Sequence, residues 1–125
     1  MEEENRIAKD IVESAIRVHR KLGPGLLESA YQAALAYLLI KKGYKVEKEK
    51  DQPVQFEEVK LDVGYRIDLL VNEKVVVELK TVDKLSKIHL AQTLTYLKLS
   101  KCRLGLLLNF NVLLMKDGIK RVINT

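Results

Sequence analysis

The apolar positions of the chain follow a helical period in three segments. Residues 5–21 carry apolar side chains three and four positions apart, with charged residues between them, as an amphipathic helix does. The segment Gly23–Gly25 ends this helix. A second, largely apolar helix is predicted over residues 26–42, with apolar side chains such as Leu27 buried. A third helix is predicted over residues 85–100.

Strand patterns occupy the remaining segments. Tyr44–Lys50 alternates between apolar and charged positions, which predicts a half-exposed strand. Residues 53–61 are predicted to be a further extended segment that starts at an edge or in a loop, because it begins with a proline. Leu104–Asn109 is almost entirely apolar, as expected of a buried central strand. A last hairpin is predicted to turn at residues 116–118, with Ile119–Ile123 as its second arm.

The most informative segment is a predicted hairpin that carries charge. Its strands, Tyr65–Val71 and Val75–Lys80, are joined by a three-residue loop, so the residues next to the loop pair with each other. This register places Asp68 directly opposite Glu78, on the same face of the sheet. Lys80 lies on that face too, because side chains two positions apart in a strand point the same way.

The predicted pair of acids needs an explanation, because two carboxylates about 5 Å apart repel each other. A divalent cation is the natural compensation, since hard cations take carboxylate oxygens as ligands. The other interpretation is a hairpin with a solvated polar face, on which Asp68, Glu78 and Lys80 only meet water. The hairpin by itself leaves both interpretations open.

Composition is that of a single soluble globular domain covering residues 1–125, with 47% hydrophobic and 31% charged residues. Cys102 is the only cysteine, which excludes an intramolecular disulfide and suits a reducing cytosol. We expect Cys102 to have a packing role. The acidic start of the chain is unlike a signal peptide, and the longest apolar run, Ala33–Ile40, is too short to span a membrane. We therefore expect a cytoplasmic protein.

The net charge of +5 permits a polyanionic partner without demanding one. Lysines are densest between residues 41 and 50, but acidic residues are interspersed among them, which favours a solvated edge over a nucleic-acid patch. His19, near the end of the first helix, is predicted to be a surface histidine that the helix dipole favours.

Polar residues also stand on the two later helices. Glu28 lies in the first turn of the second helix, where an acid complements the helix dipole, and it shares a face with Tyr31. His89, Gln92 and Tyr96 follow spacings of three and four on the third helix and so form a polar stripe. Such a stripe can simply face water, although tyrosine and histidine are less expected there than lysine and glutamate.

The order of these polar positions resembles that of the PD-(D/E)XK nuclease superfamily over nearly the whole chain. The segment Gly25–Tyr31 matches the signature of its GxxExxY family, and Asn109–Asn111 is similar to that family as well. Gln92-x-x-x-Tyr96 is similar to the last nuclease motif of RecB-type exonucleases. One departure is Ile67, which stands where the superfamily name has proline, a position that varies within the superfamily.

The resemblance implies an α/β fold with a restriction-endonuclease-like core. We expect a central mixed sheet flanked by helices, in the order α-α-β-β-β-α-β with a C-terminal hairpin. It also implies hydrolysis of phosphodiester bonds that depends on Mg²⁺ or Mn²⁺, with nucleic acid as partner and DNA as the expected substrate. No membrane is implied, and a homodimer or a protein partner is a further expectation, because small nuclease cores often need help to grip a substrate.

The resemblance also implies roles for particular residues. Asp68 and Glu78 would be metal ligands, and Glu28 would join them directly or through water. Lys80 would orient the attacking water or stabilise the charge that develops on the phosphate. Gln92 and Tyr96 would position these groups or the nucleic-acid backbone. The implied site residues are Glu28, Asp68, Glu78, Lys80, Gln92 and Tyr96.

Three functions compete at this point. The first is a metal-dependent nuclease that acts on DNA. The second is a nucleic-acid-binding or accessory module that keeps the fold without cutting, and the third is a protein-interaction domain whose acids are structural. Metal binding separates the first from the third, and cleavage separates the first from the second.

Overall fold

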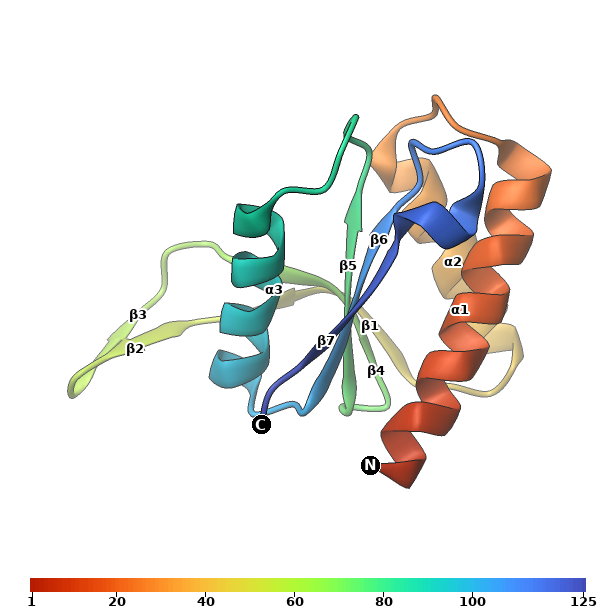
Figure 1. Cartoon of the computed structure of the whole chain (residues 1–125). Coiled ribbons are helices and arrows are strands. Elements are labelled where there is room, and N and C mark those ends of the chain that lie inside the picture. Colours follow the sequence, from red (N-terminus) through yellow and green to blue (C-terminus); the bar gives the residue numbers. More distant parts are fainter.

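The computed structural model describes all residues, 1–125. Helices pack on both faces of a five-stranded mixed sheet (Figure 1). This confirms the predicted fold class, a central mixed sheet flanked by helices. The elements are α1 (Glu2–Leu22), α2 (Glu28–Lys41), β1 (Val46–Asp51), β2 (Val54–Phe56), β3 (Val59–Leu61), β4 (Arg66–Val71), β5 (Val75–Lys80), α3 (Lys87–Ser100), β6 (Leu104–Asn109), the 3₁₀-helix η1 (Met115–Gly118) and β7 (Ile119–Ile123).

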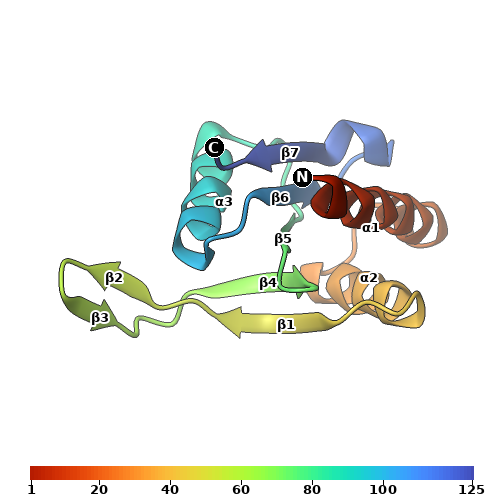
Figure 2. The same cartoon turned by 90° about the horizontal axis from the view of Figure 1, so that it is seen from below.

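The main sheet has the strand order β1-β4-β5-β6-β7. Only β5 and β6 pair in parallel, because α3 carries the chain from the end of β5 back to the start of β6. The other neighbours are antiparallel. Seen from below, α1 and α2 lie on one face of the sheet and α3 on the other (Figure 2). The charged strand β1 is at one edge, where its lysines meet water as predicted.

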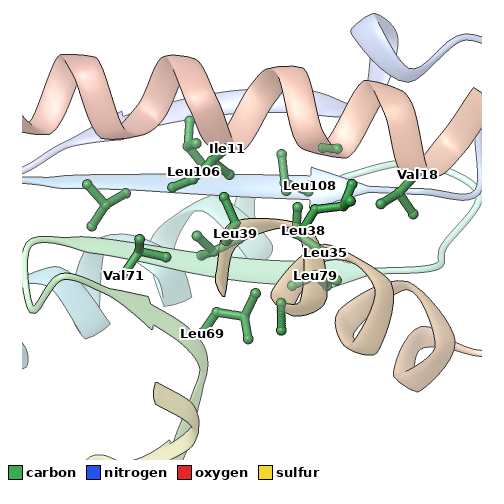
Figure 3. Packing of buried hydrophobic residues seen from close by; sticks show 14 of the residues in the cluster. Ile11, Val18, Leu35, Leu38, Leu39, Leu69, Val71, Leu79, Leu106 and Leu108 are labelled. Atoms are coloured by element: carbon green, nitrogen blue, oxygen red, sulfur yellow. The ribbon is translucent and has the colours of Figure 1, made fainter. Parts of the chain in front are cut away.

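The two faces of the sheet have separate cores. Twenty buried residues from α1, α2, the sheet and the segment after β6 form the larger one (Figure 3). Alternation along β5 decides which side each residue joins. Val75, Val77 and Leu79 pack with α1 and α2, whereas Val76 packs with α3 in a smaller cluster. Glu78 and Lys80 are two and four residues after Val76, so their side chains lie on the same face of the sheet, the one that α3 covers.

Residues 53–61 differ from the prediction of one extended segment. They fold into a separate antiparallel ribbon, β2 and β3, because Glu57 takes a left-handed backbone conformation (φ 54°) that reverses the chain. The ribbon leaves the sheet and extends past α3 (Figures 1 and 2). The predicted last hairpin has β6 and β7 as its arms, and its predicted turn residues lie in η1. Gly118 is needed there, because a Cβ would lie 2.0 Å from the carbonyl oxygen of Asn109.

Two predictions about the first two helices are wrong. His19 is buried, and its Nε2 donates a hydrogen bond to the carbonyl oxygen of Val112 at 2.7 Å, because the segment after β6 folds back over α1. The second helix starts at Glu28, two residues later than predicted. Leu27 is its N-cap and is exposed, not buried. Cys102 is buried, as its predicted packing role requires. No helix is long and apolar enough to cross a membrane.

Candidate functional site

The hairpin of β4 and β5 has the predicted register. Leu69 pairs with Val77 and Val71 pairs with Val75, so the loop between the strands has three residues. Asn72 and Glu73 both take left-handed backbone conformations there, with φ of 51° and 57°. The side chain of Asn72 accepts a hydrogen bond from the backbone N–H of Lys45 at 2.8 Å, which ties the loop to the start of β1.

Beyond Leu69, side chains take over the contacts between the two strands. The backbone N–H of Asp68 donates to Oε2 of Glu78 at 2.9 Å. In return, the backbone N–H of Leu79 donates to Oδ2 of Asp68 at 2.8 Å. Each carboxylate therefore bonds the backbone of the opposite strand. The two acids lie side by side between β4 and β5, where the sheet interior would otherwise continue.

Burial gives this pair unusual proton affinity. Glu78 is only 4% exposed. Its pKa is raised to about 8, first because burial removes the carboxylate from water and then because Asp68 lies close by. The pKa of Asp68 is also raised, chiefly by burial, although the hydrogen bond from the backbone of Leu79 opposes the shift. Without a cation, the pair therefore favours keeping a proton at neutral pH.

Glu28 stands in the first turn of α2, and the loop before this helix is held in place. The hydroxyl of Tyr31 fixes the loop before this helix, because it donates to the carbonyl oxygen of Gly23 at 2.5 Å and accepts from the backbone N–H of Leu26 at 3.1 Å. The ring of Tyr31 is fully buried and stacks on Phe110, with centroids 4.6 Å apart. Tyr31 and its neighbours thus hold the helix start on which Glu28 stands.

Glu28 interacts electrostatically with the pair. Its pKa is raised, first by burial and then by the proximity of Asp68, while Lys80 opposes the shift. Glu28 in turn contributes to the raised pKa of Glu78. These acids therefore act on one another electrostatically, although they come from α2, β4 and β5.

Lys80 and α3 complete this region. Nζ of Lys80 donates to Oε1 of Gln92 at 3.4 Å, a long hydrogen bond across from β5 to α3. One turn further along α3, Tyr96 is buried against the sheet. The pKa of the Tyr96 hydroxyl is raised by burial and then by the charges of Glu78 and Asp68. The structure thus brings all six candidate residues to the end of β5 or its immediate surroundings.

A family model described as the PD-(D/E)XK nuclease superfamily matches residues 5–122. The chain belongs to this superfamily. Its five-stranded mixed sheet with three flanking helices is consistent with the restriction-endonuclease-like fold. No curated protein and no solved structure matches the chain significantly.

The arrangement of the carboxylates limits which ion the candidate site can hold. Nowhere are three or more Asp, Glu, His or Cys side chains gathered closely enough to hold a metal ion. Asp68 and Glu78 are therefore a pair of potential ligands, and Glu28 is a neighbour that acts at longer range. Mg²⁺ often uses only one or two carboxylates and keeps several waters, so the donor set of this pair fits it.

The predicted stripe on α3 divides into two parts. Gln92 and Tyr96 lie at the candidate site, but His89 does not. Its Nδ1 accepts a hydrogen bond from the backbone N–H of Ser86 at 3.0 Å, and its own backbone N–H donates to Oγ of Ser86 at 3.4 Å. This reciprocal pair is a capping box that starts the helix. His89 therefore has a structural task.

Sequence reasoning missed Glu49, and it noted Asn109 only as part of a segment similar to the family, without a role. Glu49 falls opposite Asp68 in the register of β1 and β4, has φ of 51°, and contributes to the raised pKa of both Asp68 and Glu28. Its charge was hidden among the alternating lysines and acids of β1, and the antiparallel register alone could have revealed it. Asn109 clamps the segment after Lys80, because its side chain bonds both the N–H and the carbonyl oxygen of Val82, at 3.1 and 2.8 Å.

Proposed function

We propose that the chain is a divalent-metal-dependent nuclease that hydrolyses phosphodiester bonds in DNA. Membership of the PD-(D/E)XK nuclease superfamily supports nuclease activity, since its members are usually nucleases. The observation that carries the proposal is the pair of carboxylates between β4 and β5, next to Lys80: Glu78 accepts from the backbone N–H of Asp68, and Asp68 accepts from the backbone N–H of Leu79. The segment Gly25–Tyr31 supports the GxxExxY family as the branch to which the chain belongs.

Asp68 and Glu78 would hold the metal, and Glu28 would join them directly or through water. Mg²⁺ or Mn²⁺, when bound, lowers the pKa of a water ligand and neutralises charge on the phosphate. The protein provides a carboxylate pair whose negative charge is costly to keep in its buried place. A cation relieves that cost, which is the physical reason why this site favours one.

The other residues act on the substrate without holding the metal. The ammonium of Lys80 carries three donors and no acceptor, so it orients the attacking water or stabilises the phosphate oxygens. Gln92 accepts from Nζ of Lys80 and so limits where the ammonium points. Tyr96, buried beside the carboxylates, positions these groups or the nucleic-acid backbone. A homodimer or a protein partner stays a prediction.

A second function has one observation in its favour. Because no group of three potential ligand side chains is gathered in one place, a catalytically silent nucleic-acid-binding or accessory module with the same fold is the alternative. Such a module would use the acids and Lys80 only to hold β4, β5 and α3 together. The two functions differ in whether a phosphodiester bond is broken.

Incubation of the chain with single-stranded and duplex DNA and RNA, in Mg²⁺ or Mn²⁺, tests the proposal. We expect cleavage of DNA that stops when the metal is chelated. Glu78→Gln should abolish it, whereas Glu73→Gln, on an exposed residue of the nearby loop, should cut like the wild type. Binding without cleavage under all these conditions would instead support the silent module.

A further inference from the structure

A groove runs along α3 directly beside the candidate site. It has a volume of about 370 Å³ and is lined mostly by apolar side chains. Its α3 wall extends over three turns, from Ile88 to Leu99, and includes Gln92 and Tyr96. Its other wall is formed by Val54, the first residue of β2, and by Tyr65, which directly precedes β4. Gln92 lines the groove and also accepts the hydrogen bond from Lys80, so the groove adjoins the candidate site.

Exposed apolar groups make this groove costly in water. Ile88 is 71% exposed and Tyr65 is 48% exposed. The Tyr65 ring lies 6.4 Å from the ring of Tyr96, with the two planes inclined at 59°. A flat apolar ligand placed between these walls would cover both the aliphatic side of α3 and an aromatic face. Burial of that surface is favourable by the hydrophobic effect.

Electrostatics limits how a nucleic acid can be held elsewhere on the chain. Three lysines of the basic segment 41–50 already face acids: Lys42 with Asp10, Lys45 with Glu47 and Glu73, and Lys50 with Glu47. Strong binding through phosphates alone needs a set of free cations. Stacking of bases on apolar and aromatic side chains is a further source of affinity for a nucleic acid, besides contacts to its phosphates.

We propose that this groove binds an unpaired nucleobase, so that the substrate is single-stranded DNA or DNA with a single-stranded stretch. The proposal rests on the nuclease function above and specifies its substrate. A duplex presents charged phosphates to its surroundings, and these would lose hydration in an apolar groove. An unpaired base presents a π-face that suits it. α3 has no acid in its first turn, and Lys84 and Lys87 stand at that end, where the adjoining phosphates would pass.

Binding without metal tests this proposal independently of cleavage. Fluorescence anisotropy in EDTA would measure the dissociation constants of an oligothymidine strand and of a blunt duplex of the same length. We expect the single strand to bind at least tenfold more tightly. Tyr65→Ala should weaken single-strand binding by about 5- to 150-fold, which corresponds to the loss of one stacked base. Duplex binding should change by less than about twofold, and Tyr65→Phe, which keeps the ring, should bind like the wild type.

Tyr37 provides a matched control. It is an exposed tyrosine (62%) that lines a different groove, between α1 and α2. Tyr37→Ala should leave both affinities unchanged, and thermal melting would show that each variant is folded. Equal loss of single-strand and duplex binding in Tyr65→Ala, or no loss in either, would overturn the proposal. In the second case, a protein segment becomes the better occupant.

The two proposals fail in different ways. If the groove proposal is wrong and the nuclease proposal right, Tyr65→Ala binds and cuts normally while Glu78→Gln is inactive. If the nuclease proposal is wrong, no variant cuts, yet the difference between Tyr65→Ala and Tyr37→Ala in EDTA still decides whether the groove holds a base.

Discussion

The two ends of the β4–β5 hairpin have opposite character although they belong to the same pair of strands. Near the loop, backbone pairing is regular and every residue from Leu69 to Val71 and from Val75 to Val77 is buried and apolar. At the other end, backbone pairing stops. There the carboxylates of Asp68 and Glu78 accept hydrogen bonds from backbone N–H groups of the opposite strand. The loop end contributes stability through its apolar burial, and the acidic end costs stability. A sheet can therefore hold a charged site where one end of a strand pair is well packed.

Removing packing at the loop end should have the largest effect on stability. Leu69 is fully buried in the larger core. We expect Leu69→Ala to lower the free energy of unfolding by about 2–5 kcal/mol, the range for a buried leucine that leaves a cavity. Urea denaturation measures this change. If Leu69→Ala instead costs no more than Glu73→Gln on the exposed loop, the loop end is not the stabilising half of the hairpin.

At the acidic end, loss of charge should affect chemistry more than stability. Lys80→Met keeps the length and the apolar stem of the side chain but deletes the ammonium. We expect cleavage to fall by about 10²–10³-fold, the scale for one preorganised charge-stabilising donor. Metal affinity should stay the same or rise, since a cation is removed from beside the carboxylates.

Glu78→Gln is the contrasting variant, because it should lose metal binding and cleavage together. Single-turnover cleavage and calorimetric titration with Mn²⁺ would separate the two effects. Wild-type cleavage by Lys80→Met would place Lys80 outside the catalytic machinery.

The stability of the acidic end should also depend on pH. Folded Glu78 keeps its proton up to a pH of about 8, whereas in the unfolded chain it loses the proton near the ordinary value of 4.5. Between these values the folded state binds more protons, so this contribution to stability is complete below pH 4.5 and is lost as pH rises through about 8. In EDTA, the midpoint of urea denaturation should fall over this window. In Glu78→Gln, this midpoint should change less with pH. An identical pH dependence in the wild type and the variant would contradict the raised pKa of Glu78.

Local pattern was enough to predict the hairpin and its acidic pair. The alternation on β5, together with a three-residue loop, determines which residues pair from Leu69 to Val71. Alternation fails further along β4, because Ile67 packs in the smaller cluster although Leu69, two residues on, packs in the larger one. Helical spacing also showed that Glu28 shares a face with Tyr31 and that Gln92 belongs to a polar stripe, whereas the place of Glu28 and Gln92 at the site came from the resemblance. The position of the candidate metal ligands therefore followed from rules that need only neighbouring residues.

Contacts between distant segments were beyond reach of the sequence pattern. His19 is buried only because the segment around Val112 folds over α1. The ribbon of residues 54–61 depends on the left-handed backbone of Glu57, a residue type that gives no warning of it. Glu49 reaches the acids through the pairing of β1 with β4, and a lysine-rich edge strand hides that role.

The most direct test of the central claim is whether a divalent cation stabilises the chain through Asp68 and Glu78. Urea denaturation with and without Mg²⁺ or Mn²⁺ measures it. At a hundredfold excess over the dissociation constant, we predict a gain of about 2.7 kcal/mol in the free energy of unfolding. Asp68→Asn should remove most of that gain, while Asp62→Asn, a control outside the pair, should keep it. Equal gains in the wild type and Asp68→Asn would contradict a metal site between β4 and β5.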